Sequence, residues 1–135
     1  MIIGFTTETE PLTDDEKKLI PKFVIGLKKR IGKENAITNK EIREAFKRSS
    51  EINIPPARVR KIINHIRING LVELLCASSK GYYVARIEQE INQYMTGLKS
   101  RIEAQNLVLN KLIEQAKQLK QEGYVKRNNR TIPRR

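Results

Sequence analysis

The chain has 135 residues, which is enough for one small domain and an appendage, and its 27 Lys and Arg against 15 Asp and Glu give a formal net charge of +12. So basic a chain favours an anionic partner, with nucleic acid first and a membrane surface or an acidic protein second. A single cysteine excludes an intramolecular disulfide. No segment approaches the roughly 20 apolar residues of a membrane span, and the first residues show no signal-peptide pattern. We therefore expect a cytoplasmic protein.

The first predicted helix follows a short lead. We expect residues 1–12 to be flexible. The sequence from Thr13 to Glu16 then forms a capping box, in which a hydroxyl and a carboxylate satisfy backbone donors at a helix start. Pro21 lies within the helix and has no amide to donate, so we expect a kink or two short helices. The apolar residues that give this segment a helical period, to about Arg30, are Leu19, Ile20, Phe23, Val24, Leu27 and Ile31.

A second helix is predicted after a turn at residues 32–35 and a brief strand at Ala36-Ile37. The sequence from Thr38 to Glu41 repeats the capping box and marks the helix start. Ile42, Ala45 and Phe46 are expected to face inward, and residues 49–54 form the connection to the next helix.

The third predicted helix carries a cationic and amide outer face. It opens at Pro55-Pro56, where a missing amide costs nothing, and ends at Gly70. Its buried face is predicted from a three/four spacing of Val59, Ile62, Ile63 and Ile66. At about 100° per residue, Ala57, Lys61 and Asn64 then point the opposite way. The flanks carry Arg58, Arg60, His65 and Arg67.

A β-hairpin is predicted next. Residues 71–77 are short, apolar and strand-like, residues 78–81 have turn chemistry, and residues 82–85 are rich in strand formers. Cys76 is expected to behave as a small core residue. The order of helix, short strand, helix, helix and hairpin is that of a winged helix-turn-helix, which we place at residues 13–86 of a mainly α chain.

Three stretches resemble small phage and prophage proteins with a winged helix. They are residues 35–38, residues 58–67 and the wing turn at residues 79–83, and the resemblance covers roughly residues 13 to 100. It implies a DNA-binding winged-helix fold and no defined activity.

From residue 87 to residue 122 the pattern changes to one long helix with a coiled-coil seam. Its apolar stripe keeps a 3.5-residue period that only Gln105 interrupts, and it would extend roughly 40 Å at 1.5 Å per residue. No domain of this size covers such a stripe, so we expect a homo-oligomer through this helix rather than a helix folded back on its own domain. The stripe consists of Ile91, Met95, Leu98, Ile102, Gln105, Leu109, Leu112, Ala116 and Leu119.

Two features leave the number and direction of strands open. Leu107, Val108 and Ile113 widen the apolar face, which favours more strands or packing against the winged domain. The flanking cations have no obvious acidic mates across a parallel dimer: Lys99, Arg101 and Lys120. Residues 123–135, rich in Lys and Arg without acids, are expected to form a disordered basic tail.

The third helix suits the major groove of double-stranded DNA. Arg58, Lys61 and Asn64 are the candidates for base edges, since Asn can pair bidentately with adenine and Arg with guanine. We expect phosphate contacts from Arg60 and Arg67. The remaining candidates are His65 as a groove or surface residue, Lys80 as a phosphate or minor-groove contact or an ordinary turn lysine, and the helix start at Thr38 as a backbone phosphate contact.

The inventory of residues argues against an enzyme. It yields no Ser/His/acid set, no metal cluster and no Walker A loop, and we expect no cofactor, metal, membrane or small-molecule ligand. The leading hypothesis is a phage or prophage regulator or DNA-organising factor, associated with the nucleoid of a bacterial host. The alternative is a protein-docking adaptor in a phage replication or packaging assembly. RNA binding is a third possibility, which the lack of an aromatic stacking platform on the basic face disfavours.

Overall fold

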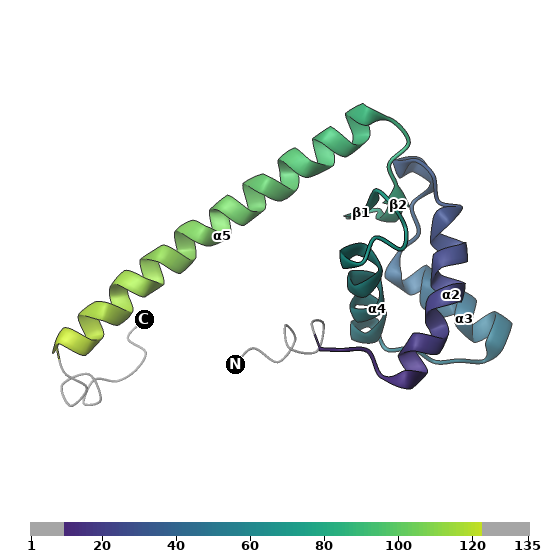
Figure 1. The fold of residues 1–135 in the computed structure, drawn as a ribbon, viewed down its shortest axis with the longest axis horizontal. Coiled ribbons are helices and arrows are strands. Elements are labelled where there is room, and N and C mark those ends of the chain that lie inside the picture. The colour runs from purple at the N-terminus through teal and green to yellow at the C-terminus, as the bar shows by residue number, and fades with distance from the viewer. Residues whose placement is uncertain (1–9, 123–135) are drawn as a thin grey trace. The chain divides into compact units, whose positions relative to one another are not determined.

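The computed structural model describes residues 10–122, and these are mainly helical with one small hairpin and a long C-terminal helix (Figure 1). Contacts divide the chain into two units, with the boundary between Tyr94 and Met95. Residues 1–9 of the predicted lead and the predicted basic tail at 123–135 lie outside the described residues. The elements are α2 (Asp14–Lys28), the 3-10 helix η1 (Lys33–Asn35), α3 (Asn39–Ser50), α4 (Pro56–Ile68), β1 (Leu75–Ser78), β2 (Gly81–Val84) and α5 (Glu88–Glu122).

The capping box at the start of α2 is confirmed. The Thr13 hydroxyl accepts from the Glu16 amide at 3.2 Å, and the Glu16 carboxylate accepts from the Thr13 amide at 2.8 Å. The helix runs through Pro21 as one element rather than two. Pro21 has no amide to donate to the carbonyl of Lys17, but both residues are exposed, so water can replace the missing bond.

The prediction of a flexible lead is wrong at its end. Leu12 is buried, with 8% of its surface exposed, and it belongs to the main hydrophobic core. Its apolar side chain precedes the α2 cap directly, so burying it anchors the entry into the helix.

The main core lies between α2, α3 and α4. The Phe23 and Phe46 rings pack with their centroids 5.1 Å apart and tie α2 to α3. The inward face predicted for α4 is confirmed, since the side chains at its three/four spacing are almost fully buried: Val59, Ile62, Ile63 and Ile66.

The hairpin is antiparallel, and its register from Leu75↔Val84 to Ser78↔Gly81 leaves Ser79 and Lys80 as a two-residue turn. The first strand begins four residues later than predicted. The brief strand expected before α3 is present as a single bridge, in which Ile37 and Tyr82 exchange backbone hydrogen bonds of 2.9 and 2.8 Å. The hairpin is thereby joined directly to the residue that precedes the α3 cap.

The first two turns of α5 belong to the first unit. Ile91 and Tyr94 pack against a small cluster formed by Cys76, Tyr83 and Ala85. Cys76 is fully buried there, as predicted. Ile91 is therefore partly buried within its own unit, and its place in the oligomerisation stripe stays a prediction. From residue 99 to residue 118 every residue of α5 is exposed.

Candidate nucleic-acid interface

The exposed side of α4 is smaller than its sequence predicts. Arg58 and Arg60 are exposed, whereas Ala57, Asn64 and His65 are half-buried. The helix has no side-chain cap, and Pro56 stands in its first turn. This side of the helix carries no carboxylate of its own, because Asp and Glu are absent between Glu51 and Glu73.

Lys61 does not face solvent, so the prediction that it reads base edges is wrong. Its side chain is only 7% exposed, and its Nζ lies 2.9 Å from Oε1 of Glu16. A lysine is buried only when its charge is paired, and the start of α2 supplies that partner. Glu16 was predicted only as a capping-box residue, because the capping pattern gives no sign of a partner on α4.

Glu16 links the start of α2 to two cations of α4. Its second oxygen lies 3.3 Å from Nε of Arg58, whose side chain stays 46% exposed. Burial acts to raise the pKa of the Glu16 carboxyl, but the hydrogen bonds from Thr13 and Lys61 and the charges of Lys61 and Arg58 outweigh it, so the pKa lies below its ordinary value of 4.5. The carboxylate is therefore ionised at neutral pH, and it neutralises part of the face predicted to meet DNA.

Arg67, predicted to contact phosphates, is half-buried and contacts Tyr94 at the start of α5. Its Nη2 donates to the Tyr94 hydroxyl at 2.6 Å, and its guanidinium carbon lies 5.6 Å from the centre of the Tyr94 ring. Tyr94 lies 27 positions after Arg67 in the chain, so no local sequence pattern in α4 indicates this contact.

Thr38 begins α3 as predicted, but its capping box occupies the groups expected to hold a phosphate. The Glu41 carboxylate accepts from the Thr38 amide at 2.9 Å, and the Glu41 amide donates to the Thr38 hydroxyl at 3.1 Å. These hydrogen bonds from Thr38 keep the pKa of the Glu41 carboxyl below its ordinary value. An anion already stands at this helix start, which opposes a phosphate there.

Four of the predicted contacts remain on or near the surface. Arg60 is exposed, and Asn64 is half-buried one turn further along α4. His65 accepts or donates through Nδ1 at 3.3 Å from the Asn69 amide nitrogen. Lys80 is exposed in the hairpin turn, where its backbone amide donates to the Ser78 hydroxyl at 3.1 Å. We refer to these four side chains and the half-exposed Arg58 together as the α4–hairpin surface: Arg58, Arg60, Asn64, His65 and Lys80.

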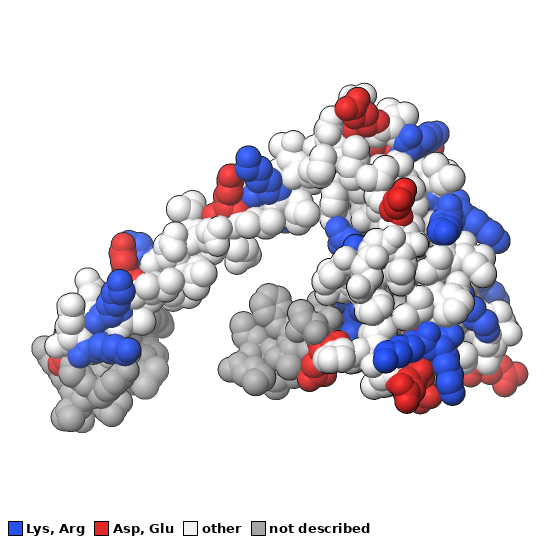
Figure 2. Space-filling model, in the orientation of Figure 1, with Lys and Arg blue, Asp and Glu red and all other residues white. Residues whose placement is uncertain are grey.

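Positive charge also lies outside this surface. Figure 2 shows Lys and Arg over the right-hand side of the first unit, where α2 and α3 run. Exposed cations on these two helices include Lys17, Lys18, Lys22, Lys40, Lys47 and Arg48. The basic character of the first unit is therefore spread over three helices rather than concentrated on α4.

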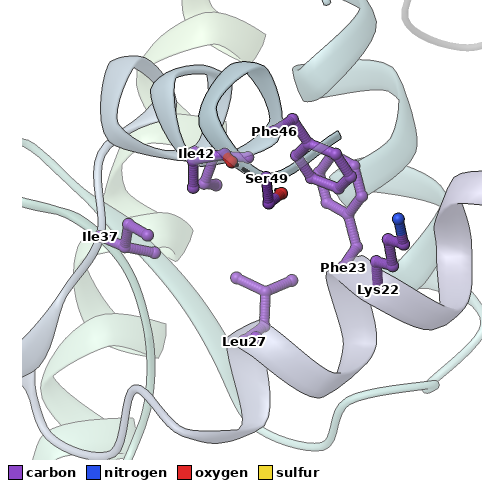
Figure 3. Close-up of a pocket in the computed structure, with 9 residues that line it drawn as sticks. Lys22, Phe23, Leu27, Ile37, Ile42, Phe46 and Ser49 are labelled. Atoms are coloured by element: carbon purple, nitrogen blue, oxygen red, sulfur yellow. Dashed lines mark hydrogen bonds between the residues drawn. The ribbon is translucent and has the colours of Figure 1, made fainter. Parts of the chain in front are cut away.

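An apolar groove separates α2 from α3 (Figure 3). It has a volume of about 190 Å³, and its lining includes Phe23 and Leu27 of α2 and Ile42 of α3 on the opposite side. Lys22 stands at the rim, and its Nζ donates to the Ser50 hydroxyl at 3.0 Å. The groove was not predicted from the sequence, because the residues that line it follow an ordinary core pattern.

The described part of the chain, residues 10–122, contains no group of three or more His, Cys, Asp or Glu side chains placed to hold a metal ion. Over the same residues, no helix combines the length and apolarity that crossing a bilayer requires. Comparison with family models, with curated proteins and with solved structures gives no match to this chain.

Proposed function

We propose that the first unit binds double-stranded DNA as a winged helix, with α4 toward the major groove and the β1–β2 turn toward the backbone. The role that fits this activity is a regulator or DNA-organising factor of phage or prophage origin, without enzymatic activity. The observation that carries the proposal is the surface that α4 exposes, which combines cations and an amide with no carboxylate in the helix itself.

The arrangement of elements supports the same proposal. The Ile37–Tyr82 bridge joins the hairpin to the segment before α3, and α3 leads through a short connection into α4. Asn39 strengthens this link, since its side-chain amide donates to the Pro56 carbonyl at 3.1 Å and accepts from Arg43 at 2.8 Å. These hydrogen bonds fasten the start of α4 to α3, which favours presenting the α4 side chains to a groove in one orientation.

The residues proposed to contact DNA follow from exposure. We assign Arg60 and Lys80 to phosphate contacts and Asn64 to a base edge. Arg58 has a divided role, because one side of its guanidinium contacts Glu16 while nearly half of its side chain stays exposed. Lys61 and Arg67 position α4 within the fold and are not part of the proposed contact.

The test is fluorescence anisotropy with a random-sequence duplex over a salt series. The variant Arg60→Ala/Lys80→Ala removes two exposed cations from the proposed contact. Its matched control, Lys111→Ala/Lys117→Ala, removes the same charge from exposed positions of α5. Each lost phosphate contact should reduce the salt slope by about 1, so the first variant should lose about 2 per chain and the control nothing.

Two results would overturn the proposal. One is no binding by the wild-type protein at low salt. The other is an equal loss of affinity in both variants, which would mean that the overall charge rather than this surface attracts DNA. Circular dichroism of each variant checks that the fold is intact.

The groove between α2 and α3 favours a second candidate function, a protein-docking adaptor. Its apolar floor and cationic rim suit an amphipathic segment that carries acidic residues. Ala45→Glu would place a carboxylate in this groove, away from the α4–hairpin surface. Loss of a protein partner with unchanged DNA binding in that variant would favour the adaptor, and unchanged partner binding would count against it.

A further inference from the structure

The apolar stripe of α5 is exposed along most of its length in the described residues. Residues 99–118 are exposed throughout, and the apolar stripe within them includes Ile102, Leu109 and Leu112, each more than half exposed. Most helices in proteins owe their stability to packing of an apolar face, because helix propensity alone is marginal in water. Within the second unit the stripe begins at Met95, and Ile91 before it is partly buried in the first unit.

We propose that residues 95–119 of α5 pair with the same residues of a second copy as a parallel, in-register, two-stranded coiled coil. The inference does not rest on DNA binding, and it names a direction and a register that the apolar stripe alone leaves open. The seam has the heptad positions a and d filled by Met95, Leu98, Ile102, Gln105, Leu109, Leu112, Ala116 and Leu119.

Gln105 selects the parallel direction. In a parallel, in-register pair each residue at position d faces the same residue of the second chain, so the two Gln105 amides can hydrogen-bond to each other. In an antiparallel pair a residue at position d faces a residue at position a. In the registers with most overlap, the residue that faces Gln105 is then Ile102, Leu109 or Ala116. An amide buried against these side chains has no partner, which opposes the antiparallel pair.

Val108 and Ile113 select the same arrangement. They occupy a g position and the e position five residues later, and each is about half exposed. Across a parallel, in-register pair these positions are neighbours, so Val108 of each chain meets Ile113 of the other on both sides of the seam. In an antiparallel pair g faces g and e faces e, so these two residues could not cover each other.

The remaining flanking positions limit the coil to two strands. Lys99, Arg101 and Lys120 lie beside the seam at e and g positions. Bundles of more strands bury these positions, whereas a two-stranded coil leaves them in water. In the parallel register Arg101 faces Asn106 and Lys120 faces Gln115, so no two cations are brought together.

The experiment uses single cysteine variants of the full chain under mild oxidation. Met95→Cys and Leu119→Cys lie near opposite ends of the seam, and Leu107→Cys is the control because position f faces away from it. The wild-type protein supplies the background, since Cys76 is buried. A disulfide needs Cα atoms about 4.4–6.8 Å apart, a distance that facing seam residues reach and f residues do not.

The proposal expects disulfide-linked dimers of Met95→Cys and of Leu119→Cys, at least tenfold more than of Leu107→Cys. Light scattering should give twice the 15.6 kDa mass of one chain. A second experiment mixes the Met95→Cys and Leu119→Cys variants in equal amounts, with a size tag on one of them. Disulfides formed only between the tagged and the untagged chain would overturn the proposal, because residues 95 and 119 face each other only in an antiparallel pair. A single-chain mass, or the mass of three or more chains, would overturn it as well. None of these readouts involves DNA, so they are independent of the function proposed above.

Discussion

The Glu16 carboxylate accepts a hydrogen bond from the Thr13 amide at its own helix start and forms ion pairs with Arg58 and Lys61 of α4, so one side chain links the start of α2 to α4. The Glu16 carboxylate and the Lys61 ammonium are both almost fully buried, at 5% and 7% side-chain exposure. Removing one partner of a buried pair leaves the other charge uncompensated in a poorly hydrated site. The two residues are therefore expected to matter more for stability than for ligand binding.

Lys61→Ala should destabilise the first unit by about 2–3 kcal/mol. The loss should be smaller than the roughly 3–5 kcal/mol of a fully isolated pair, because Arg58 still faces the carboxylate. Urea unfolding followed by circular dichroism measures it. Lys40→Ala, a change of the same type at an exposed position of α3, should stay within about 0.5 kcal/mol of the wild type. A Lys61→Ala protein as stable as the Lys40→Ala control would contradict the buried pair.

The lowered pKa of the Glu16 carboxyl makes a pH prediction. A carboxyl whose pKa is lower in the folded than in the unfolded state adds stability above its unfolded value of 4.5, and this contribution is lost as the pH falls through the folded pKa. Glu16→Gln should therefore be less stable than the wild type at pH 7, and the two free energies of unfolding should converge as the pH falls below 4.5. Glu44→Gln, which removes an exposed carboxylate, controls for net charge. A difference that stays constant from pH 7 to pH 3 would contradict the ion pair as its cause.

At the scale of elements, Gly81 holds the hairpin against the start of α3. Its φ of +119° lies in a region that side chains avoid, and a Cβ there would lie 2.8 Å from the Thr38 amide nitrogen and closer still to the Ile37 carbonyl. The glycine thus permits the Ile37–Tyr82 bridge.

Gly81→Ala should cost about 2 kcal/mol or more, because it strains the backbone and pushes the hairpin from Ile37. Gly26→Ala is the matched control: Gly26 lies inside α2 with nothing within 4 Å of a Cβ, so the added methyl group should stabilise by about 0.5–1 kcal/mol. Thermal unfolding of both variants tests the contrast, and equal effects in the same direction would contradict the close approach at Gly81.

The element boundaries that local chemistry determines were predictable. Each capping box depends on two residues three positions apart, and the start of α4 depends on the proline pair itself, and the structure confirms all three. The direction of Lys61 was not predictable, because its partner Glu16 precedes it by 45 positions. The contact between Arg67 and Tyr94 was not predictable for the same reason, since Tyr94 lies beyond the hairpin. Periodicity gives the angle of a side chain about its helix axis, but only tertiary contacts decide what covers it.

At the scale of the whole molecule, the two units differ in how they are stabilised. The first unit has its own core between α2, α3 and α4, together with the small cluster around Cys76. The second unit is a helix whose described residues, apart from a few at the ends, are exposed. A unit with its own core unfolds at a temperature independent of protein concentration, whereas a unit completed by a second copy does not.

Thermal unfolding should therefore show two transitions, of which only the one belonging to α5 shifts to higher temperature as the protein concentration rises. Leu112→Ala should lower that transition, because it removes a seam side chain while keeping a strong helix former. Leu107→Ala makes the same chemical change at a position 72% exposed and outside the seam, so it should leave the transition in place. Circular dichroism at several concentrations of each variant measures both effects. Equal shifts in the two variants would mean that Leu112 stabilises α5 no more than an outward leucine does, and the seam would then have no role in holding the helix.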